Sequence, residues 1–537
     1  MASDAARTII AACALAVTAT RQKVFSPLAV YKLLLGSALT IAYGLGIGHA
    51  QPTKIDRGLV LSGVTVVDTH TGGLTPDQAV VIVDGRITWI GRKDGIATGG
   101  FTQLVKAKGK FLVPGFQDMH AHVIDYPDRD DDLAVMLAYG ITGWRQMGAF
   151  DSLLQQRKDG KLQLPSDSPE LLGMPGDVLL RFNIDTPEKA VAEVDRQKAL
   201  GADFIKTIDG SPEVFFAALE EARRDGLPFV GHLSPGVDAL EASKAGMRSI
   251  EHLGPQERLL ISCSTDEAMI RDVMARNRPP SFPPNMSKDA IQKMMQLFTA
   301  EPMLASLAAS PESFSHLQRV VDTYNEEKCR IAAKVFVEHG TWQVPTLIRE
   351  RTAEFGDDPQ YTEDPNLRYV SVVTKQLWGQ ASLEFTARLT PQDRETLKQL
   401  MAVQLKVVKL FDDTGVRMLT GSDFGGIWLV PGFSLHQEFD QLAAAGLSPL
   451  RVLQMTTLDG AEFMGLQMTA GSVEVGKDAN LVLLDGNPIE SVSNLHKINA
   501  VVRAGKYYSG VTLQAMKDGA AAHLASVAAK EGVTPKP

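Results

Sequence analysis

The sequence predicts an α/β protein in which a (β/α)8 TIM barrel carries a small β-sandwich domain formed from both chain ends. Between residues 113 and 467, short apolar β-runs alternate with helical patterns, which is typical of parallel strands joined by crossover helices. Segments 57–112 and 468–512 are instead rich in short strands and tight turns. The 537 residues, 44% of them hydrophobic, supply ample apolar material for a large core.

The two chain ends share Val-, Ile- and Thr-rich runs that are separated by glycine turns. Asp84-Gly85 and Gly505-Lys506 predict hairpins, because a tight primed turn needs the positive φ angles that glycine supplies. We therefore expect both ends to pair into one domain. Its strands are expected at 59–61, 63–67, 79–83, 480–484 and 500–503.

Eight segments between these ends predict the barrel strands. Two long helical insertions, at about 257–338 and 349–410, follow strands, where barrel enzymes build their substrate pockets. Residues 513–537 are expected to form a C-terminal helix and tail. The barrel strands are expected at 111–120, 140–147, 170–173, 203–208, 228–232, 248–252, 343–347 and 417–422.

Residues 1–50 have the features of a secretory signal. A basic flank precedes an apolar run at 33–47, and small residues follow at Gly48 and Ala50. A membrane anchor is the alternative, although the run is slightly shorter than the roughly 20 apolar residues that span a bilayer. We expect a mature chain that begins near Gln51 and is secreted or periplasmic.

Charge and cysteine content exclude several classes of protein. The net charge of −9 argues against a nucleic-acid binder, which usually presents a basic face. Three cysteines in 537 residues exclude a disulfide scaffold and any Cys-rich zinc module. Without residues 1–50, Cys263 and Cys329 remain, either as a pair or as two buried thiols. Because nothing in the local sequence favours a bridge, we expect thiols.

The first candidate metal ligands are His120 and His122. Residues two apart on a strand point to the same face, so both imidazoles can bind one ion. A lone His-x-His pair is often structural, but this one ends a predicted strand and follows Asp118.

Four further residues end predicted barrel strands: Lys206, His232, His252 and Asp423. Two histidines at the ends of successive strands fit metal ligands that face one mouth of a barrel. A lysine ammonium cannot bind a metal, but the neutral amine can react with carbon dioxide to give a carbamate. From spacing alone, Lys206 is an ordinary lysine at a strand end. Asp423 would by itself be a turn residue, and the presence of the other three groups is what favours a function for it.

Three motifs resemble the amidohydrolase superfamily: the opening signature at 113–122, the second-strand motif at 140–147 and the return strand at 471–482. Segments 342–347 and 364–369 further resemble its prolidase- and imidazolonepropionase-like branch, which includes amidases that cleave ochratoxin. The chain departs from the family in its insertion at 257–338 and at Gly143-Trp144, where a second Thr and a Val are commoner.

The resemblance implies two divalent metal ions, for which zinc is expected. His120, His122 and Asp423 would hold the first ion, and His232 and His252 the second. A carbamate on Lys206 and a hydroxide would bridge them. The hydroxide would attack the scissile carbonyl, and Asp423 would pass its proton to the leaving amine.

The expected activity is therefore that of a secreted metal-dependent amidohydrolase acting on a small amide, such as an N-acyl amino acid, a dipeptide or an ochratoxin-like amide. Deaminases of the superfamily carry a Glu three residues after the fifth-strand histidine, where this chain has Pro235. Two alternatives are a lactone or cyclic-amide hydrolase and, outside the enzymes, a barrel that serves as an interaction scaffold. Nucleic acid is not expected as a partner, and a homo-oligomer is left open.

Overall fold

The computed structural model describes residues 53–530, apart from 125, 182–183, 255–257 and 277–311. The predicted leader, residues 1–50, and the last residues of the predicted tail lie outside the described residues. The described part of the tail forms α19 (Gly510–Lys530), which packs against α1 (Arg129–Ala138).

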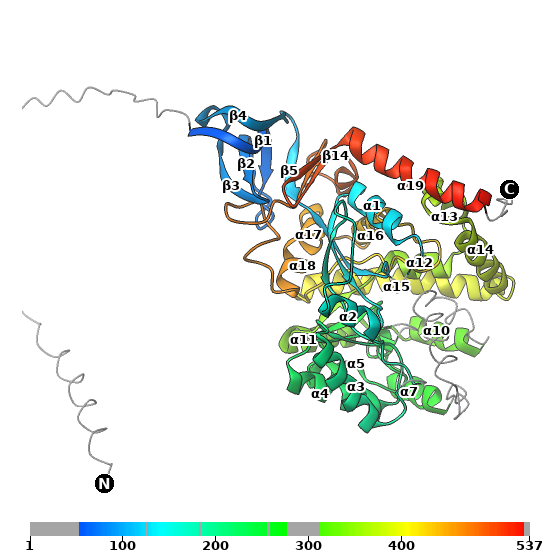
Figure 1. Cartoon of the computed structure of the whole chain (residues 1–537). Coiled ribbons are helices and arrows are strands. Elements are labelled where there is room, and N and C mark those ends of the chain that lie inside the picture. The colour runs from blue at the N-terminus through cyan, green and yellow to red at the C-terminus, as the bar shows by residue number, and fades with distance from the viewer. Residues whose placement is uncertain (1–52, 125, 182–183, 255–257, 277–311, 531–537) are drawn as a thin grey trace, which may run out of the picture. The chain divides into compact units, whose positions relative to one another are not determined.

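Strands from both chain ends form one eight-stranded sheet, drawn in blue and red-brown in Figure 1. Its order is β15-β14-β13-β5-β1-β2-β3, with β4 paired to β1. β5 joins the two ends, because it runs parallel to β1 on one side and antiparallel to β13 on the other. The strands are β1 (Thr53–Val67), β2 (Leu74–Val83), β3 (Arg86–Arg92), β4 (Ile96–Lys106), β5 (Phe111–Pro114), β13 (Leu481–Leu484), β14 (Ile498–Arg503) and β15 (Lys506–Ser509).

Both predicted hairpins are present in this sheet. Asp84 and Gly85, with φ of 50° and 79°, turn the chain between β2 and β3. The second turn uses Ala504 and Gly505, one residue earlier than predicted, and joins β14 to β15. The sandwich arrangement and the domain boundaries stay predictions.

Deleting residues 468–537 should cost the protein its solubility, because β13 would no longer cover the edge of β5. A point variant tests the same contact: Val482, fully buried opposite Val113, should not tolerate aspartate, since burying an unpaired charge is among the most destabilising changes. Val475→Asp, at a position 59% exposed, is the control. Equal melting temperatures for both variants would show that this pairing is wrong.

The central part of the chain is an α/β unit with a TIM-barrel-like arrangement. One sheet has the order β6-β7-β8 and another the order β12-β11-β10-β9, and all these pairs are parallel. The strands are β6 (Phe116–Ala121), β7 (Ile141–Gln146), β8 (Glu170–Gly173), β9 (Ile205–Thr207), β10 (Phe229–Gly231), β11 (Ser249–Glu251) and β12 (Trp342–Val344).

Backbone hydrogen bonds connect the two sheets on both sides. On one side the chain that follows β8 bonds to β9, because the Leu179 N–H donates to the Lys206 carbonyl at 2.9 Å. On the other, Leu419 N–H donates to Gln343 O at 2.9 Å and Met119 N–H to Thr420 O at 3.0 Å. The predicted strand at 417–422 therefore lies between β12 and β6, but it carries isolated bridges only, so closure of the eight-stranded ring stays a prediction.

The first predicted barrel strand, 111–120, is two strands in the structure. β5 belongs to the composite sheet and β6 to the barrel region, with Gly115 between them. A Cβ at Gly115 would lie 2.1 Å from the Thr142 side chain, so only glycine allows the chain to pass there from one sheet to the other.

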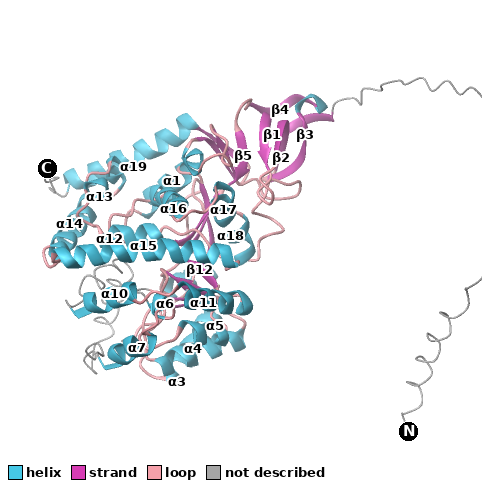
Figure 2. Ribbon diagram, turned by 180° about the vertical axis from the view of Figure 1, so that it is seen from behind, coloured by secondary structure: helices cyan, strands magenta, loops and turns pink. Residues whose placement is uncertain are grey.

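Helices follow the strands and cover them, and Figure 2 shows the long α15 crossing this region. α4 shows how such helices begin and end. Ser211 Oγ accepts from the Val214 N–H at the start of α4, and Gly226, with φ of 71°, ends the helix. The barrel-region helices are α2 (Asp151–Lys158), α3 (Pro187–Leu200), α4 (Pro212–Asp225), α5 (Ala239–Ala245), α6 (Arg258–Ile261), α7 (Glu267–Arg276), α10 (Glu312–Asp322), α11 (Glu326–His339), α12 (Leu347–Glu354), α13 (Pro359–Thr362), α14 (Val372–Thr386), α15 (Pro391–Thr414), α16 (Phe433–Ala444), α17 (Pro449–Met455) and α18 (Leu458–Phe463). None of the helices in the described ranges has the length and apolar character needed to cross a bilayer.

The expectation that Cys263 and Cys329 are unpaired thiols is wrong, because a disulfide joins them. They lie 66 residues apart, so no local pattern could reveal the pairing. The insertion folds back on itself: Asn325 N–H donates to Cys263 O at 2.8 Å, and Ser264 pairs with Tyr324. This places Cys329, on the first turn of α11, beside Cys263.

A chain that begins near Gln51, denatured without reductant, should react with no thiol reagent and should expose two thiols after reduction. Because the bridge closes a loop of 66 residues, reduction should lower the free energy of unfolding by about 4 kcal/mol. Thiol titration and denaturant melts check both numbers. Two reactive thiols before reduction would contradict the pairing.

Candidate metal centre

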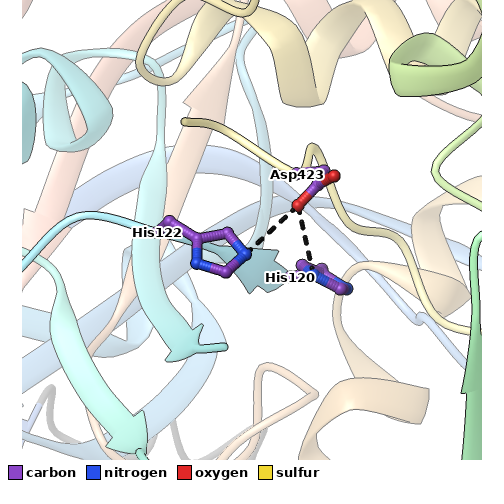
Figure 3. A group of neighbouring side chains, drawn as sticks. All are labelled: His120, His122 and Asp423. Carbon is purple, nitrogen blue, oxygen red and sulfur yellow. Dashed lines mark ion pairs between the residues drawn. The ribbon is translucent and has the colours of Figure 1, made fainter. Parts of the chain in front are cut away.

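His120, His122 and Asp423 form a buried group at the carboxyl end of β6 (Figure 3). The Nε2 atoms of His120 and His122 lie 3.2 and 3.3 Å from Oδ1 of Asp423. The backbone fixes this approach, since Asp423 N–H donates to His120 O at 2.7 Å and His122 N–H to Phe424 O at 2.8 Å. The predicted pair of imidazoles on one face of a strand is thus observed, with the predicted carboxylate opposite it.

The other three predicted residues reach the same place. Lys206 Nζ lies 3.5 Å from His120 Nε2, and His252 Nε2 lies 3.8 Å from Asp423 Oδ2. The His232 and His252 rings are 4.9 Å apart between centroids. All six predicted side chains, from segments up to 303 residues apart in sequence, therefore meet in one buried cluster.

His252 and Asp423 adopt unusual backbone conformations, with φ of 58° and 53°. Positive φ is uncommon for residues other than glycine and collects at functional sites, where the surrounding structure holds it. In a regular strand, successive side chains point to opposite faces. The positive φ at His252 interrupts this alternation at the end of β11, so the side chains of Glu251 and His252 both reach the cluster.

Burial sets the protonation states of the cluster. It lowers the pKa of His122, and it lowers those of His232 and His252 well below their usual range, so these imidazoles are neutral and carry a free lone pair. Burial also lowers the pKa of the Lys206 amine to about 8. For Asp423, burial opposes ionisation, but the neighbouring His252 and His120 outweigh it and hold the pKa well below its usual range.

The residues of this group are suited to hold a bound cation. The Nε2 atoms of His120 and His122 approach one carboxylate oxygen, yet within the described residues Asp423 Oδ1 accepts no well-formed hydrogen bond. Each of the three residues offers one ligand atom, and these atoms all lie within 4.8 Å of one another. The residues are His120, His122 and Asp423. Histidine nitrogens and a carboxylate are the ligands that zinc takes in hydrolytic sites.

Sequence reasoning missed four side chains that hold this cluster. Glu251 Oε2 lies 2.8 Å from His120 Nδ1, and Arg145 Nη2 donates to Glu251 Oε1 at 3.0 Å. Thr346 Oγ1 lies 2.5 Å from His252 Nδ1, and Arg349 Nε lies 3.1 Å from Asp423 Oδ2. The signal for Glu251 was present: a charged residue inside an apolar strand run needs a buried partner.

A barrel-like α/β fold with histidines, a lysine and an aspartate at strand ends is that of metal-dependent hydrolases. The chain belongs to the amidohydrolase family, whose model matches residues 201–508. The family predicted from the motifs is therefore confirmed.

The curated relatives match only part of this chain. An adenine deaminase of Paracoccus denitrificans is 40% identical over 65 residues, 12% of this chain and 11% of the relative. An imidazolonepropionase of Mycolicibacterium smegmatis is 35% identical over 81 residues, which are 15% of this chain and 20% of the relative. A second adenine deaminase, from Ruegeria pomeroyi, is 28% identical over 222 residues, which are 37% of this chain and 36% of the relative. The matches thus span about a tenth to a third of these relatives.

Solved structures resemble the fold over most of the chain. A bottromycin amidohydrolase has a TM-score of 0.62 at 21% identity and covers 87% of this chain and 90% of its own. A Xaa-Pro dipeptidase with bound methionine has a TM-score of 0.55 at 18% identity, and the match covers 84% of this chain and 99% of the dipeptidase. The ochratoxinase of A. niger has a TM-score of 0.51 at 16% identity, and the match covers 85% of this chain and 96% of the ochratoxinase. At these identities the likeness concerns the fold alone.

Proposed function

We propose that the chain hydrolyses a C–N amide bond of a small carboxylate-bearing molecule at a centre of two divalent metal ions. The observation that carries this proposal is the convergence of His120, His122, Lys206, His232, His252 and Asp423 in one buried cluster. His120, His122 and Asp423 would hold one ion, and His232 and His252 the other. Lys206, as a carbamate, would lie between them.

Bound divalent ions would polarise a carbonyl and make a water nucleophilic near neutral pH. The chain's own residues supply the proton chemistry. Asp423 presents Oδ1 to His120 and His122, which leaves Oδ2, beside Arg349, to accept a proton and to return it to the leaving amine.

Arg349 supports a substrate with a carboxylate. Its guanidinium is buried at the cluster, where Nε lies next to Asp423 Oδ2 and Nη1 donates to Glu350 Oε1, and guanidinium groups recognise carboxylates with well-defined geometry. N-acyl amino acids, dipeptides and ochratoxin-like amides all carry such a group, whereas a simple lactone does not.

Deamination is the second candidate, because adenine deaminases are among the relatives. The deaminase pattern that the family resemblance implies needs a Glu three residues after His232, and Pro235 stands there. Pro235 cannot act as an acid or base, so we favour amide hydrolysis.

A hydrolysis screen tests the proposed function. Its arms are N-acyl amino acids, Xaa-Pro dipeptides, an ochratoxin-like amide, lactones and adenine. We expect turnover of a carboxylate-bearing amide and much slower turnover of the same amide with its carboxylate converted to a carboxamide. Exclusive turnover of adenine or of lactones would contradict the proposal.

We also propose that residues 1–50 direct export to an oxidising compartment. The Cys263–Cys329 disulfide supports this, since structural disulfides are rare in reducing compartments. N-terminal sequencing of the exported fraction should give a chain that starts near Gln51. An intact Met1 chain confined to the cytosol would contradict it.

A further inference from the structure

Two buried charged residues stand behind the histidines, outside the six proposed ligands. They are Glu251, at the end of β11, and Arg145, on β7, and both side chains are fully buried. A buried ion pair is weak evidence for stability, because removing two charges from water is costly. The pair therefore calls for another role.

Glu251 determines which nitrogen of His120 faces the cluster. Its carboxylate can only accept, so the His120 Nδ1 at 2.8 Å carries the hydrogen. In the neutral imidazole, Nε2 is then the nitrogen that carries the lone pair, and it lies 3.2 Å from Asp423 Oδ1 and 3.5 Å from Lys206 Nζ. That is the tautomer a metal ligand needs.

The carboxylate itself is held at both oxygens. Glu251 Oε1 accepts from Arg145 Nη2 at 3.0 Å and from Ser249 Oγ at 2.6 Å. Arg145 in turn donates from Nε to the Met119 carbonyl at 2.7 Å and lies 4.9 Å from the Phe463 ring centroid. The chain of contacts runs through β7, β11 and β6, so the His120 ring is fixed by rigid strands.

Two of the other histidines have weaker supports. The Nδ1 of His252 faces the neutral hydroxyl of Thr346 at 2.5 Å. In the described part of the chain, the buried Nδ1 of His122 makes no hydrogen bond. The Nδ1 of His120 thus faces a carboxylate, and the Nδ1 of His252 faces a hydroxyl. A carboxylate partner raises the basicity of an imidazole, so His120 should bind a metal more strongly than His252.

We infer that Glu251 is a positioning residue that orients His120 and makes the metal position of His120, His122 and Asp423 the tighter of two unequal positions. The inference rests on the proposed two-metal function. It assigns Thr346 the corresponding, weaker role at the position of His232 and His252.

Zinc affinity tests this inference. The zinc-loaded full chain is titrated with a chelator, and zinc release is followed for wild type, Glu251→Gln and Thr346→Val. We expect two separate release steps in wild type. Glu251→Gln should weaken the tighter step by about 10–100-fold, and Thr346→Val should weaken mainly the other step. An unchanged tighter step in Glu251→Gln would overturn the inference, whereas a wild type that binds no zinc would overturn the proposed function instead.

A double variant separates positioning from folding. Glu251→Gln leaves Arg145 buried without its carboxylate, so the single variant can fail to fold for that reason alone. Arg145→Met combined with Glu251→Gln removes both charges. We expect the double variant to fold and to keep the weakened tighter step, with a changed visible spectrum when loaded with cobalt. Recovery of wild-type zinc affinity in the double variant would show a merely structural role and overturn the inference.

Discussion

Replacing Lys206 with alanine should remove most of the bound metal and most of the hydrolytic activity. Lys206 is 1% exposed and reaches His120 Nε2, so it is no surface lysine. Loss of a residue that only hydrogen-bonds to a metal ligand typically weakens metal binding by roughly 10–100-fold. Because Lys206 is proposed to hold the metals itself, its replacement should weaken metal binding by more than that. Lys206→Arg should fare no better, because its guanidinium stays charged and cannot be carboxylated. Metal analysis and turnover number check both variants.

Two controls make this result specific. Lys244→Ala, on the exposed side of α5, should change the free energy of unfolding by no more than about 0.5 kcal/mol and leave metal content alone. Short carboxylic acids should restore part of the activity of Lys206→Ala by standing in for the carbamate. Full metal content and normal turnover in Lys206→Ala would disprove the carbamate bridge.

The carbamate also predicts a pH dependence with a definite sign. Carbon dioxide reacts with the neutral amine, and burial lowers the pKa of Lys206 to about 8. About a tenth of the amine is then neutral at pH 7, and the fraction grows as the pH rises through 8. Metal uptake by metal-free protein in bicarbonate should therefore increase from pH 6 to pH 8. Uptake that is independent of bicarbonate would argue against the bridge.

Changing Asp423 to asparagine should lower the turnover number by roughly 10²–10⁴-fold, the contribution typical of a positioned acid or base. Asparagine keeps the shape of Asp423 but cannot take a proton from the nucleophile and pass it to the leaving amine. The fall should appear equally in kcat and kcat/KM, because the lost interaction belongs to the transition state.

The leaving group distinguishes proton transfer from simple loss of metal. A nitroanilide departs with little help from an acid, so Asp423→Asn should lose less activity on an N-acyl nitroanilide than on the matching alkyl amide. Rates are compared at equal metal content. Equal losses on both substrates would assign Asp423 to metal binding alone.

The sequence predicted much of the candidate site because the proposed ligands follow simple rules of spacing. His120 and His122 are two residues apart on a strand, and both reach Asp423 as that spacing requires. Lys206 was different, since spacing made it an ordinary lysine and only the family resemblance singled it out. Its burial now supports that choice.

The residues behind the ligands could not be predicted in the same way. Strict alternation along β11 would turn Glu251 away from the face of His252, but the φ of 58° at His252 breaks that alternation. Thr346, with φ of 45°, follows β12 in a conformation that no sequence pattern announces. The Cys263–Cys329 bridge likewise depends on how an insertion of many residues folds back.

The fold shows the same division. Alternating β-runs and helices located β7 to β12 within a few residues, because buried parallel strands are short apolar runs. The passage from β5 to β6 at Gly115 escaped prediction, since residues 111–120 were expected to form one strand but serve two different sheets.

Metal content tests the account most directly. Protein purified without chelators is freed of loose metal, and its divalent ions are counted per chain by mass spectrometry alongside its amidase activity. We predict two equivalents in the active wild type, and loss of activity in step with their removal. Fully active protein that holds one equivalent or none would contradict the two-metal centre.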